Sequence, residues 1–136
     1  FCIVGDGELN EGQCWEAFQF IAHHKLNNLT VLVDWNKQQL DGTLDEVIQP
    51  FDLAKKFTAF GFEAQTVPGA DIPALYGALK PVREAQQRPL AIVLDSIKGQ
   101  GVPWLEQLSN SHHLRLTPEQ RQAIDAEIAA LEAAHD

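Results

Sequence analysis

The feature that most constrains the fold of this chain is its alternation of short apolar runs with longer amphipathic segments. The first run, Phe1–Val4, is apolar at every position, which is typical of a strand buried on both faces of a parallel sheet. Strands that alternate with helices favour an α/β fold, a parallel sheet with helices on both faces. The predicted strands cover residues 1–4, 29–34, 62–67 and 90–97.

Helices are predicted between these strands from the spacing of their apolar residues. They cover residues 11–26, 48–60 and 71–87, and Gly61 is expected to end the second of them as a left-handed cap. The first helix carries more apolar surface than one sheet face needs, so we expect part of it to be buried against another subunit. Its apolar residues are Trp15, Phe18, Phe20, Ile21, Ala22 and Leu26.

A last helix is predicted from the residues that begin it. Thr117 is the expected N-cap, Pro118 occupies the first helical position, and Gln120 completes a capping box. Its buried stripe would consist of Ile124, Ile128 and Leu131.

The segments between these elements contain two turns and one long loop. Asp41-Gly42 and Pro68-Gly69 predict turns. The stretch over residues 99–116 has no clear element, and a loop of that length in a compact domain is usually functional or mobile. Its glycines and its histidines, His112 and His113, favour a lid that closes over a bound ligand. A mobile surface loop is the alternative.

The composition excludes several classes of protein. A formal charge of −9 argues against a nucleic-acid or anionic-membrane surface, because both require clustered Lys and Arg. No apolar run approaches the roughly 20 residues of a membrane-spanning helix, and the first residues lack a secretory signal. Cys2 and Cys14 have no metal-ligand spacing, so we expect buried, reduced thiols in a cytoplasmic protein.

Polar residues follow three of the predicted strands, where ligands bind in open parallel sheets. These segments are Gly5-Asp6-Gly7-Glu8, Asp34-Trp35-Asn36 and Lys98-Gly99-Gln100-Gly101. Asp and Asn oxygens suit Mg²⁺ or Ca²⁺, and Mg²⁺ completes its coordination with phosphate oxygens and water. Glycines next to Asp6 would let backbone amides approach a phosphate. The combination predicts a metal-bridged diphosphate.

Taken one at a time, these residues have simpler interpretations. A lone Gly-Asp-Gly is most often a tight turn, Asn36 could cap a turn, and Lys98 could be solvated. His23 and His24 lie within a predicted helix and are interpreted as structural or solvated. The convergence at strand ends is what favours a site.

Four stretches carry a resemblance that narrows this hypothesis. They are GDGELNEGQCWEA (5–17), DWNKQQLDG (34–42), KKFTAFGFEAQTVPGAD (55–71) and DSIKGQGV (95–102). These stretches resemble transketolase, and Asp6 with Asn36 resembles the thiamine diphosphate signature. The resemblance implies the diphosphate domain of a thiamine diphosphate-binding fold, with its upstream part and its pyrimidine-binding domain absent from residues 1–136.

The resemblance also implies roles for individual residues. Asp6, Asn36 and the Gln38 carbonyl would bind Mg²⁺ or Ca²⁺, while Gly7 and Glu8 would lie at the thiamine diphosphate. Lys98 and His112 would close over the diphosphate and the reacting carbon. His113 is an alternative to His112, because the glycine that usually follows this histidine in the family is missing here. Glu11 and Glu16 would join the acidic network that links paired active sites.

The activity implied is transfer of a two-carbon ketol unit between sugar phosphates, which this chain could not perform alone. Its partner would be a pyrimidine-binding (C-terminal) transketolase subunit or domain, in a dimer or heterotetramer. Because the sequence opens inside a strand without Met, we expect a portion of a longer chain or a split subunit. Deoxyxylulose phosphate synthesis, 2-oxo acid decarboxylation and a non-catalytic assembly module are the alternatives.

Overall fold

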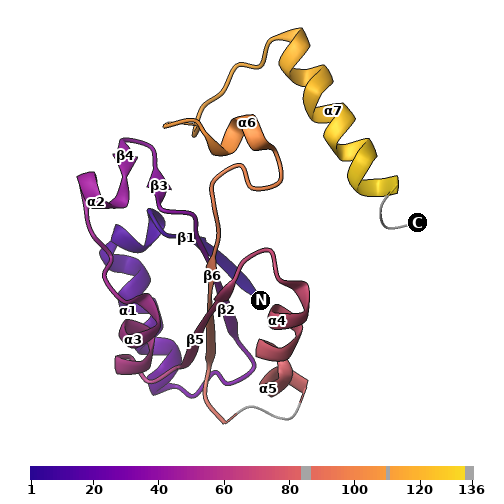
Figure 1. Ribbon diagram of the computed structural model, residues 1–136. Coiled ribbons are helices and arrows are strands. Elements are labelled where there is room, and N and C mark those ends of the chain that lie inside the picture. The colour runs from indigo at the N-terminus through magenta and orange to yellow at the C-terminus, as the bar shows by residue number, and fades with distance from the viewer. Residues whose placement is uncertain (84–86, 110, 134–136) are drawn as a thin grey trace. The chain divides into compact units, whose positions relative to one another are not determined.

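The computed structural model describes residues 1–83, 87–109 and 111–133. The chain divides into two compact units, residues 1–97 and 98–136. The first unit contains a parallel sheet of four strands in the order β1-β2-β6-β5 (Figure 1). These strands are β1 (Cys2–Gly5), β2 (Thr30–Trp35), β5 (Glu63–Pro68) and β6 (Leu90–Asp95). The predicted α/β fold and its strands are confirmed.

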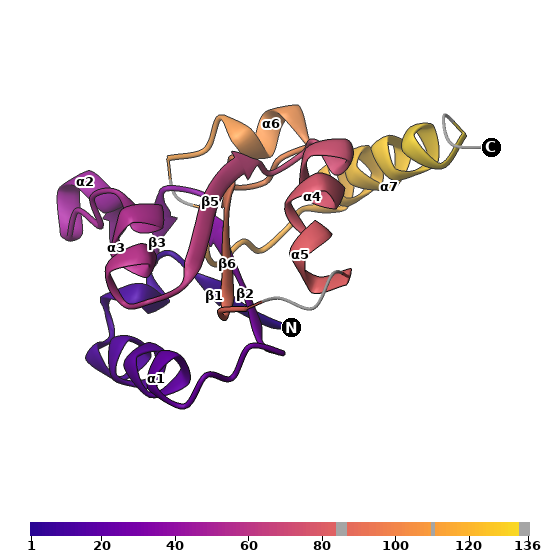
Figure 2. The ribbon, with the colours of Figure 1, turned by 90° about the horizontal axis from the view of Figure 1, so that it is seen from below.

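Helices cover both faces of this sheet, as predicted. Helices α1 (Gly12–His23) and α3 (Leu53–Ala59) lie on one face, and α4 (Ile72–Ala78), followed by α5 (Lys80–Arg83), lies on the other (Figure 2). The end of the predicted helix over 71–87 includes residues 84–86, which lie outside the described residues. Smaller elements are η1 (Glu8–Asn10), α2 (Leu44–Val47) and the hairpin strands β3 (Gln38–Gln39) and β4 (Gly42–Thr43).

Two apolar clusters, one on each face, hold the sheet between its helices. Alternate residues of β6 pack in one cluster or the other, because successive side chains of a strand point to opposite faces of the sheet. Ala91 and Val93 pack with the α1 and α3 side, where Phe57 is fully buried, while Ile92 packs with the α4 side around Ala78. The helices thereby fix the carboxyl ends of the strands, from which the candidate site is built.

The prediction that the first strand is fully buried is wrong. Among the described strands, β1 lies at the edge of the sheet and pairs with β2 alone. Val4 faces the α1 side and is buried, whereas Ile3 is 71% exposed and Cys2 is exposed. A continuous apolar run predicts burial on both faces of a strand, but the described residues bury only one face of β1. The prediction of buried thiols is therefore wrong for Cys2; Cys14 is partly buried, and both thiols are free.

The helix predicted over 48–60 is confirmed only for α3, because residues 48–52 are not helical. Pro50 disfavours helical backbone at the residue before it, and Phe51 has a left-handed φ of 57°. Helix α3 therefore begins only after Asp52, whose carboxylate accepts a hydrogen bond from the Lys55 amide at 2.9 Å. Gly61 has the expected left-handed conformation, with a φ of 94°.

Helix α1 is shorter than the predicted 11–26 and buries fewer residues. It ends at His23, and Lys25 follows in a left-handed conformation. Phe18 is buried, and Trp15 packs partly buried against the same cluster. Phe20, however, is 57% exposed, and Leu26 is also exposed.

The second unit contains α6 (Pro103–Glu106) and α7 (Pro118–Ala133). The short helix α6 lies within the stretch predicted as a loop; residue 110 of that stretch lies outside the described residues. The capping box of α7 is confirmed by hydrogen bonds in both directions between Thr117 and Gln120. The burial predicted for its stripe is wrong, since Ile128 is exposed and α7 has no buried residue among those described.

None of the helices in the described part of the chain is long and apolar enough to cross a membrane.

Candidate functional site

The candidate site lies at the carboxyl ends of β1, β2 and β6, which the parallel register brings to one edge. Gly5 of β1 is in register with Asp34 of β2, and Trp35 of β2 is in register with Asp95 of β6. Backbone bonds continue past the strands, from the Asp6 amide to the Asp34 carbonyl at 3.1 Å and from the Ser96 amide to the Trp35 carbonyl at 3.1 Å. The residues that follow these strands are therefore neighbours.

Asp6 is the central residue of this edge. Its side chain is only 1% exposed, and no other ionisable side chain among the described residues is buried. Its Oδ1 accepts a hydrogen bond from the Gly7 amide at 2.8 Å, and its Oδ2 accepts one from the Lys37 amide at 2.6 Å. The Lys37 amide belongs to the turn between Asn36 and Gln38. The structure thus brings Asp6 against the segment that carries the other predicted metal ligands.

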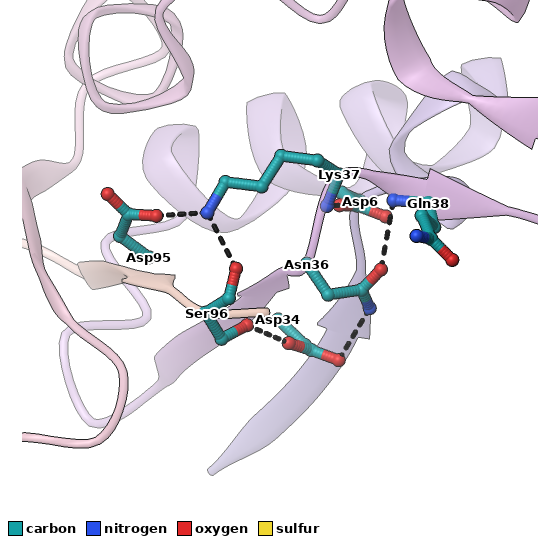
Figure 3. A network of polar contacts seen from close by, with 7 residues as sticks. All are labelled: Asp6, Asp34, Asn36, Lys37, Gln38, Asp95 and Ser96. Atoms are coloured by element: carbon teal, nitrogen blue, oxygen red, sulfur yellow. Dashed lines mark hydrogen bonds and ion pairs between the residues drawn. The ribbon is translucent and has the colours of Figure 1, made fainter. Parts of the chain in front are cut away.

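Asn36 is held by hydrogen bonds at both ends of its carboxamide (Figure 3). Its Nδ2 donates to Asp34 Oδ2 at 2.8 Å, and its Oδ1 accepts from the Gln38 amide at 3.0 Å. Asp34 also accepts a hydrogen bond at its Oδ1 from the Ser96 hydroxyl, at 2.6 Å. The side chains after β1, β2 and β6 consequently form one polar network.

Lys37 crosses this network with its side chain. Its φ is 67°, in the left-handed region that non-glycine residues seldom adopt. The ammonium contacts the Asp95 carboxylate, donates to the Ser96 carbonyl at 2.6 Å, and lies 4.8 Å from the centre of the Trp35 ring. Lys37, Asp95 and Ser96 were not predicted as site residues. Asp95 and Ser96 lay inside the predicted strand 90–97, whereas β6 ends at Asp95, and Lys37 follows β2.

The structure gives a steric reason for glycine at position 7. A Cβ at Gly7 would lie 2.8 Å from Gln39 Cβ and 3.0 Å from Gln39 Oε1, so glycine allows the loop after β1 to pack against β3. The Gly7 amide is directed to Asp6 Oδ1. Glu8 begins η1, and its Oε2 accepts a hydrogen bond from the Gly5 amide at 3.2 Å.

Glu11 and Glu16 are not among the residues that the structure joins in the Figure 3 network. Glu11 precedes α1 without capping it through its side chain, and Glu16 lies within α1; both are exposed. His23, the last residue of α1, and His24, which follows it, are exposed as expected.

Lys98 and His112 lie in the second unit, where the structure brings them together. Lys98 Nζ lies 3.4 Å from His112 Nδ1, although the two residues are 14 positions apart in the sequence. The rings of His112 and His113 are nearly perpendicular, with centres 5.0 Å apart. An ammonium and an imidazole at this separation can both donate hydrogen bonds to one anionic group.

A pocket of about 480 Å³ opens within the first unit next to the network. It is lined by residues after β2 and β6 and by the region of β4 and α2, including Asn36, Lys37, Ser96, Thr43 and Asp45. Its size falls in the range of small-molecule and cofactor sites.

The donor set of this site fits a hard divalent cation. Asp6 offers a carboxylate, Asn36 a carboxamide oxygen, and Gln38 a backbone carbonyl, which is the oxygen chemistry that Mg²⁺ and Ca²⁺ prefer. Within the described residues, no group of at least three His, Cys, Asp or Glu side chains could hold a metal. A metal bound here would therefore take few protein ligands and leave positions for phosphate oxygens and water, as Mg²⁺ commonly does.

Comparison with known families gives a match over nearly the whole chain. The family model described as "Transketolase, thiamine diphosphate binding domain" matches residues 1–130. The chain is 37% identical to the 6-deoxy-6-sulfo-D-fructose transketolase subunit SqwG of Clostridium sp. (strain MSTE9), over 94% of this chain and 46% of that protein. It is 34% identical to an apulose-4-phosphate transketolase subunit from Actinobacillus succinogenes, over 83% of this chain and 41% of that protein.

Solved structures show the same fold. The transketolase of Campylobacter jejuni matches with a TM-score of 0.78 and 28% sequence identity, over 93% of this chain and 20% of that one. The transketolase of Leishmania mexicana matches with a TM-score of 0.67 at 22% identity, over 97% of this chain and 23% of that one, and shows the fold alone. The chain thus spans less than half the length of these relatives.

Proposed function

Because this chain belongs to the family of transketolase thiamine diphosphate-binding domains, we propose that it supplies the diphosphate and metal half of a transketolase active site. The assembled enzyme transfers a two-carbon ketol unit from a ketose phosphate to an aldose phosphate. The single observation that carries this proposal is the buried carboxylate of Asp6, hydrogen-bonded to the turn that contains Asn36 and Gln38.

Asp6, Asn36 and the Gln38 carbonyl would hold Mg²⁺ or Ca²⁺, and the metal would bind the diphosphate. The backbone amides of Gly7 and Lys37 fix the two carboxylate oxygens of Asp6, so this ligand is oriented before any metal arrives. A preorganised carboxylate avoids the entropic cost of ordering on binding. Gly7 and Glu8 would border the diphosphate from the loop after β1. Thiamine diphosphate, when bound, supplies the nucleophilic carbon that accepts and passes on the two-carbon unit.

Lys98 and His112 are proposed to bind the diphosphate and to act at the reacting carbon. Their contact at 3.4 Å supports a shared role, because two nitrogen donors can offset the negative charge of one phosphate or of a developing oxyanion. The segment from Gly99 to Leu116 would act as a lid over the bound ligand. His113 is the alternative donor.

The other half of the site would come from a pyrimidine-binding subunit or domain. The relatives named above as subunits are consistent with a split enzyme, a dimer or heterotetramer, in which Glu11 and Glu16 lie at the subunit interface. Both carboxylates are exposed in this chain and are available to such an interface. We place this enzyme in the cytoplasm, where its sugar-phosphate substrates would be found.

Assay of the assembled enzyme tests this proposal. Purified with its partner, it should convert a ketose phosphate and an aldose phosphate into products that differ by two carbons, with absolute dependence on thiamine diphosphate and a divalent metal. Release of CO₂ from a 2-oxo acid, without ketol transfer, would contradict it. An assembly that binds no cofactor would contradict it as well.

A further inference from the structure

The orientation of the Asn36 carboxamide is set by a residue outside the predicted ligand set. Its Nδ2 donates to Asp34 Oδ2 at 2.8 Å while its Oδ1 accepts from the Gln38 amide at 3.0 Å. In the flipped orientation, Nδ2 would face the Gln38 N–H and Oδ1 would face the Asp34 carboxylate. A carboxylate has acceptors only and a backbone amide one donor, so both contacts would become repulsive.

Asp34 is itself held in place from the neighbouring strand. Its second oxygen, Oδ1, accepts a hydrogen bond from the Ser96 hydroxyl at 2.6 Å. Ser96 in turn is packed under the turn after β5, where a Cβ at Gly69 would lie 2.9 Å from Ser96 Cβ. Figure 3 shows the resulting chain from Ser96 through Asp34 to Asn36. Asp34 therefore links Ser96, which follows β6, to the carboxamide of Asn36, which follows β2.

We infer that Asp34 is a positioning residue that keeps the Asn36 carboxamide oxygen available to the metal. The inference rests on the proposed metal role of Asn36. Only the oxygen of that carboxamide can coordinate a cation, so the metal affinity of this site depends on which way the amide is turned. The Gln38 amide favours the same orientation but belongs to the backbone, which makes Asp34 the contact that a substitution can remove.

Two substitutions of Asp34 separate hydrogen bonding from charge. In D34N, the new carboxamide oxygen can still accept from Asn36 Nδ2, and its NH₂ group can donate to Ser96 Oγ, because a hydroxyl both donates and accepts. In D34A, both contacts are lost. Orientation by hydrogen bonding therefore predicts that D34N retains most of the metal affinity, whereas direct attraction of the metal by the Asp34 charge predicts that D34N is as impaired as D34A.

The substitution N36D supplies a second control. A carboxylate at position 36 presents oxygen whichever way it turns, so it does not need Asp34 for its orientation. In addition, it would stand beside Asp34 as a like charge. D34A should therefore weaken metal binding in the wild-type background but leave it unchanged or strengthen it in the N36D background.

The experiment measures Mn²⁺ binding by electron paramagnetic resonance on the assembled enzyme with saturating thiamine diphosphate. We expect D34A to lose on the order of tenfold in Mn²⁺ affinity, the equivalent of one hydrogen bond, D34N to lose clearly less, and D34A/N36D to bind no worse than N36D. The thermal midpoint of each metal-free variant checks that the fold is retained; if D34A does not fold, the comparison of D34N with wild type decides.

Equal losses in D34N and D34A, or a loss from D34A in both backgrounds, would overturn the positioning role. So would wild-type affinity in D34A. The variant D6A distinguishes failure of the positioning role from failure of the proposed function. If D6A abolishes Mn²⁺ binding while D34A has no effect, only the positioning role is wrong. If D6A binds Mn²⁺ as wild type does, the metal site itself is wrong, and the positioning role fails with it.

Discussion

Replacing Gly7 with Ala should destabilise the loop that carries Asp6. Gly7 has an ordinary right-handed backbone, with φ −66° and ψ −36°, so Ala meets no conformational penalty and the cost is steric alone. The new methyl group would lie 2.8 Å from Gln39 Cβ, an atom that cannot move without displacing β3. Gln39 Oε1 also accepts a hydrogen bond from Asn10 Nδ2 at 3.1 Å, which would be disturbed.

Overpacking of this kind typically costs about 1–3 kcal/mol. With a urea dependence of about 2 kcal/mol per molar, the midpoint of G7A should fall by about 1 M. The assay is urea denaturation of the metal-free enzyme followed by circular dichroism. Metal-dependent cofactor binding should weaken in parallel, because Gly7 donates to Asp6 Oδ1.

Two controls make this prediction specific to the contact with Gln39. Gly5 ends β1 two residues before Gly7, and a Cβ there would meet nothing within 4 Å, so G5A should unfold close to the wild-type midpoint. Q39G removes the Cβ that G7A would strike and should reduce the cost of G7A in the double variant. A midpoint for G7A equal to that of G5A would refute the steric reasoning, and so would an undiminished cost of G7A in the Q39G background.

Three further predictions concern the core, the acid response and the lid. F57A removes a fully buried ring and should lower the free energy of unfolding by about 3–5 kcal/mol, with F57L losing less, as measured by denaturation. Hydrogen bonds from the Lys55 side chain and amide lower the pKa of Asp52 in the folded protein. The ionised Asp52 therefore stabilises the fold above about pH 4, and this contribution is lost as pH falls through the lower folded pKa. The difference in urea midpoint between wild type and D52N should accordingly vanish in acid. Thiamine diphosphate with metal should slow proteolysis between Lys98 and Arg115, and H112A should lower turnover more than stability; equal cleavage rates, with full activity in H112A and H113A, would contradict the lid.

The sequence predicted the parallel sheet and the approach of Asp6 to the turn that carries Asn36, because both follow from strand order and from the direction of parallel strands. It did not predict how Asn36 is oriented. That depends on Asp34 and Ser96, which lie 62 residues apart and meet only through the register of β2 with β6. Contacts of this kind leave no local pattern in a sequence.

Burial was predicted less well than secondary structure. Apolar residues such as Ile3, Phe20 and Ile128 were expected to be buried, yet they are exposed in this chain. Burial of an apolar side chain is favourable, but the sequence of one chain does not say whether the same chain or another one buries it. The break before α3 could have been predicted from Pro50, because the residue before a proline disfavours the helical region.

The central claim is that Asp6 anchors a metal-bound diphosphate. Calorimetric titration of the assembled enzyme with thiamine diphosphate, with and without Mg²⁺, tests it on wild type, D6N and D45N. Asp45 lines the pocket that Asn36 also lines, but it lies outside the network of Asp6 and Asn36, so D45N matches the loss of charge without removing the proposed ligand. We predict that D6N loses Mg²⁺-dependent affinity by at least about 100-fold, while D45N binds within about twofold of wild type. Wild-type affinity in D6N would contradict the account.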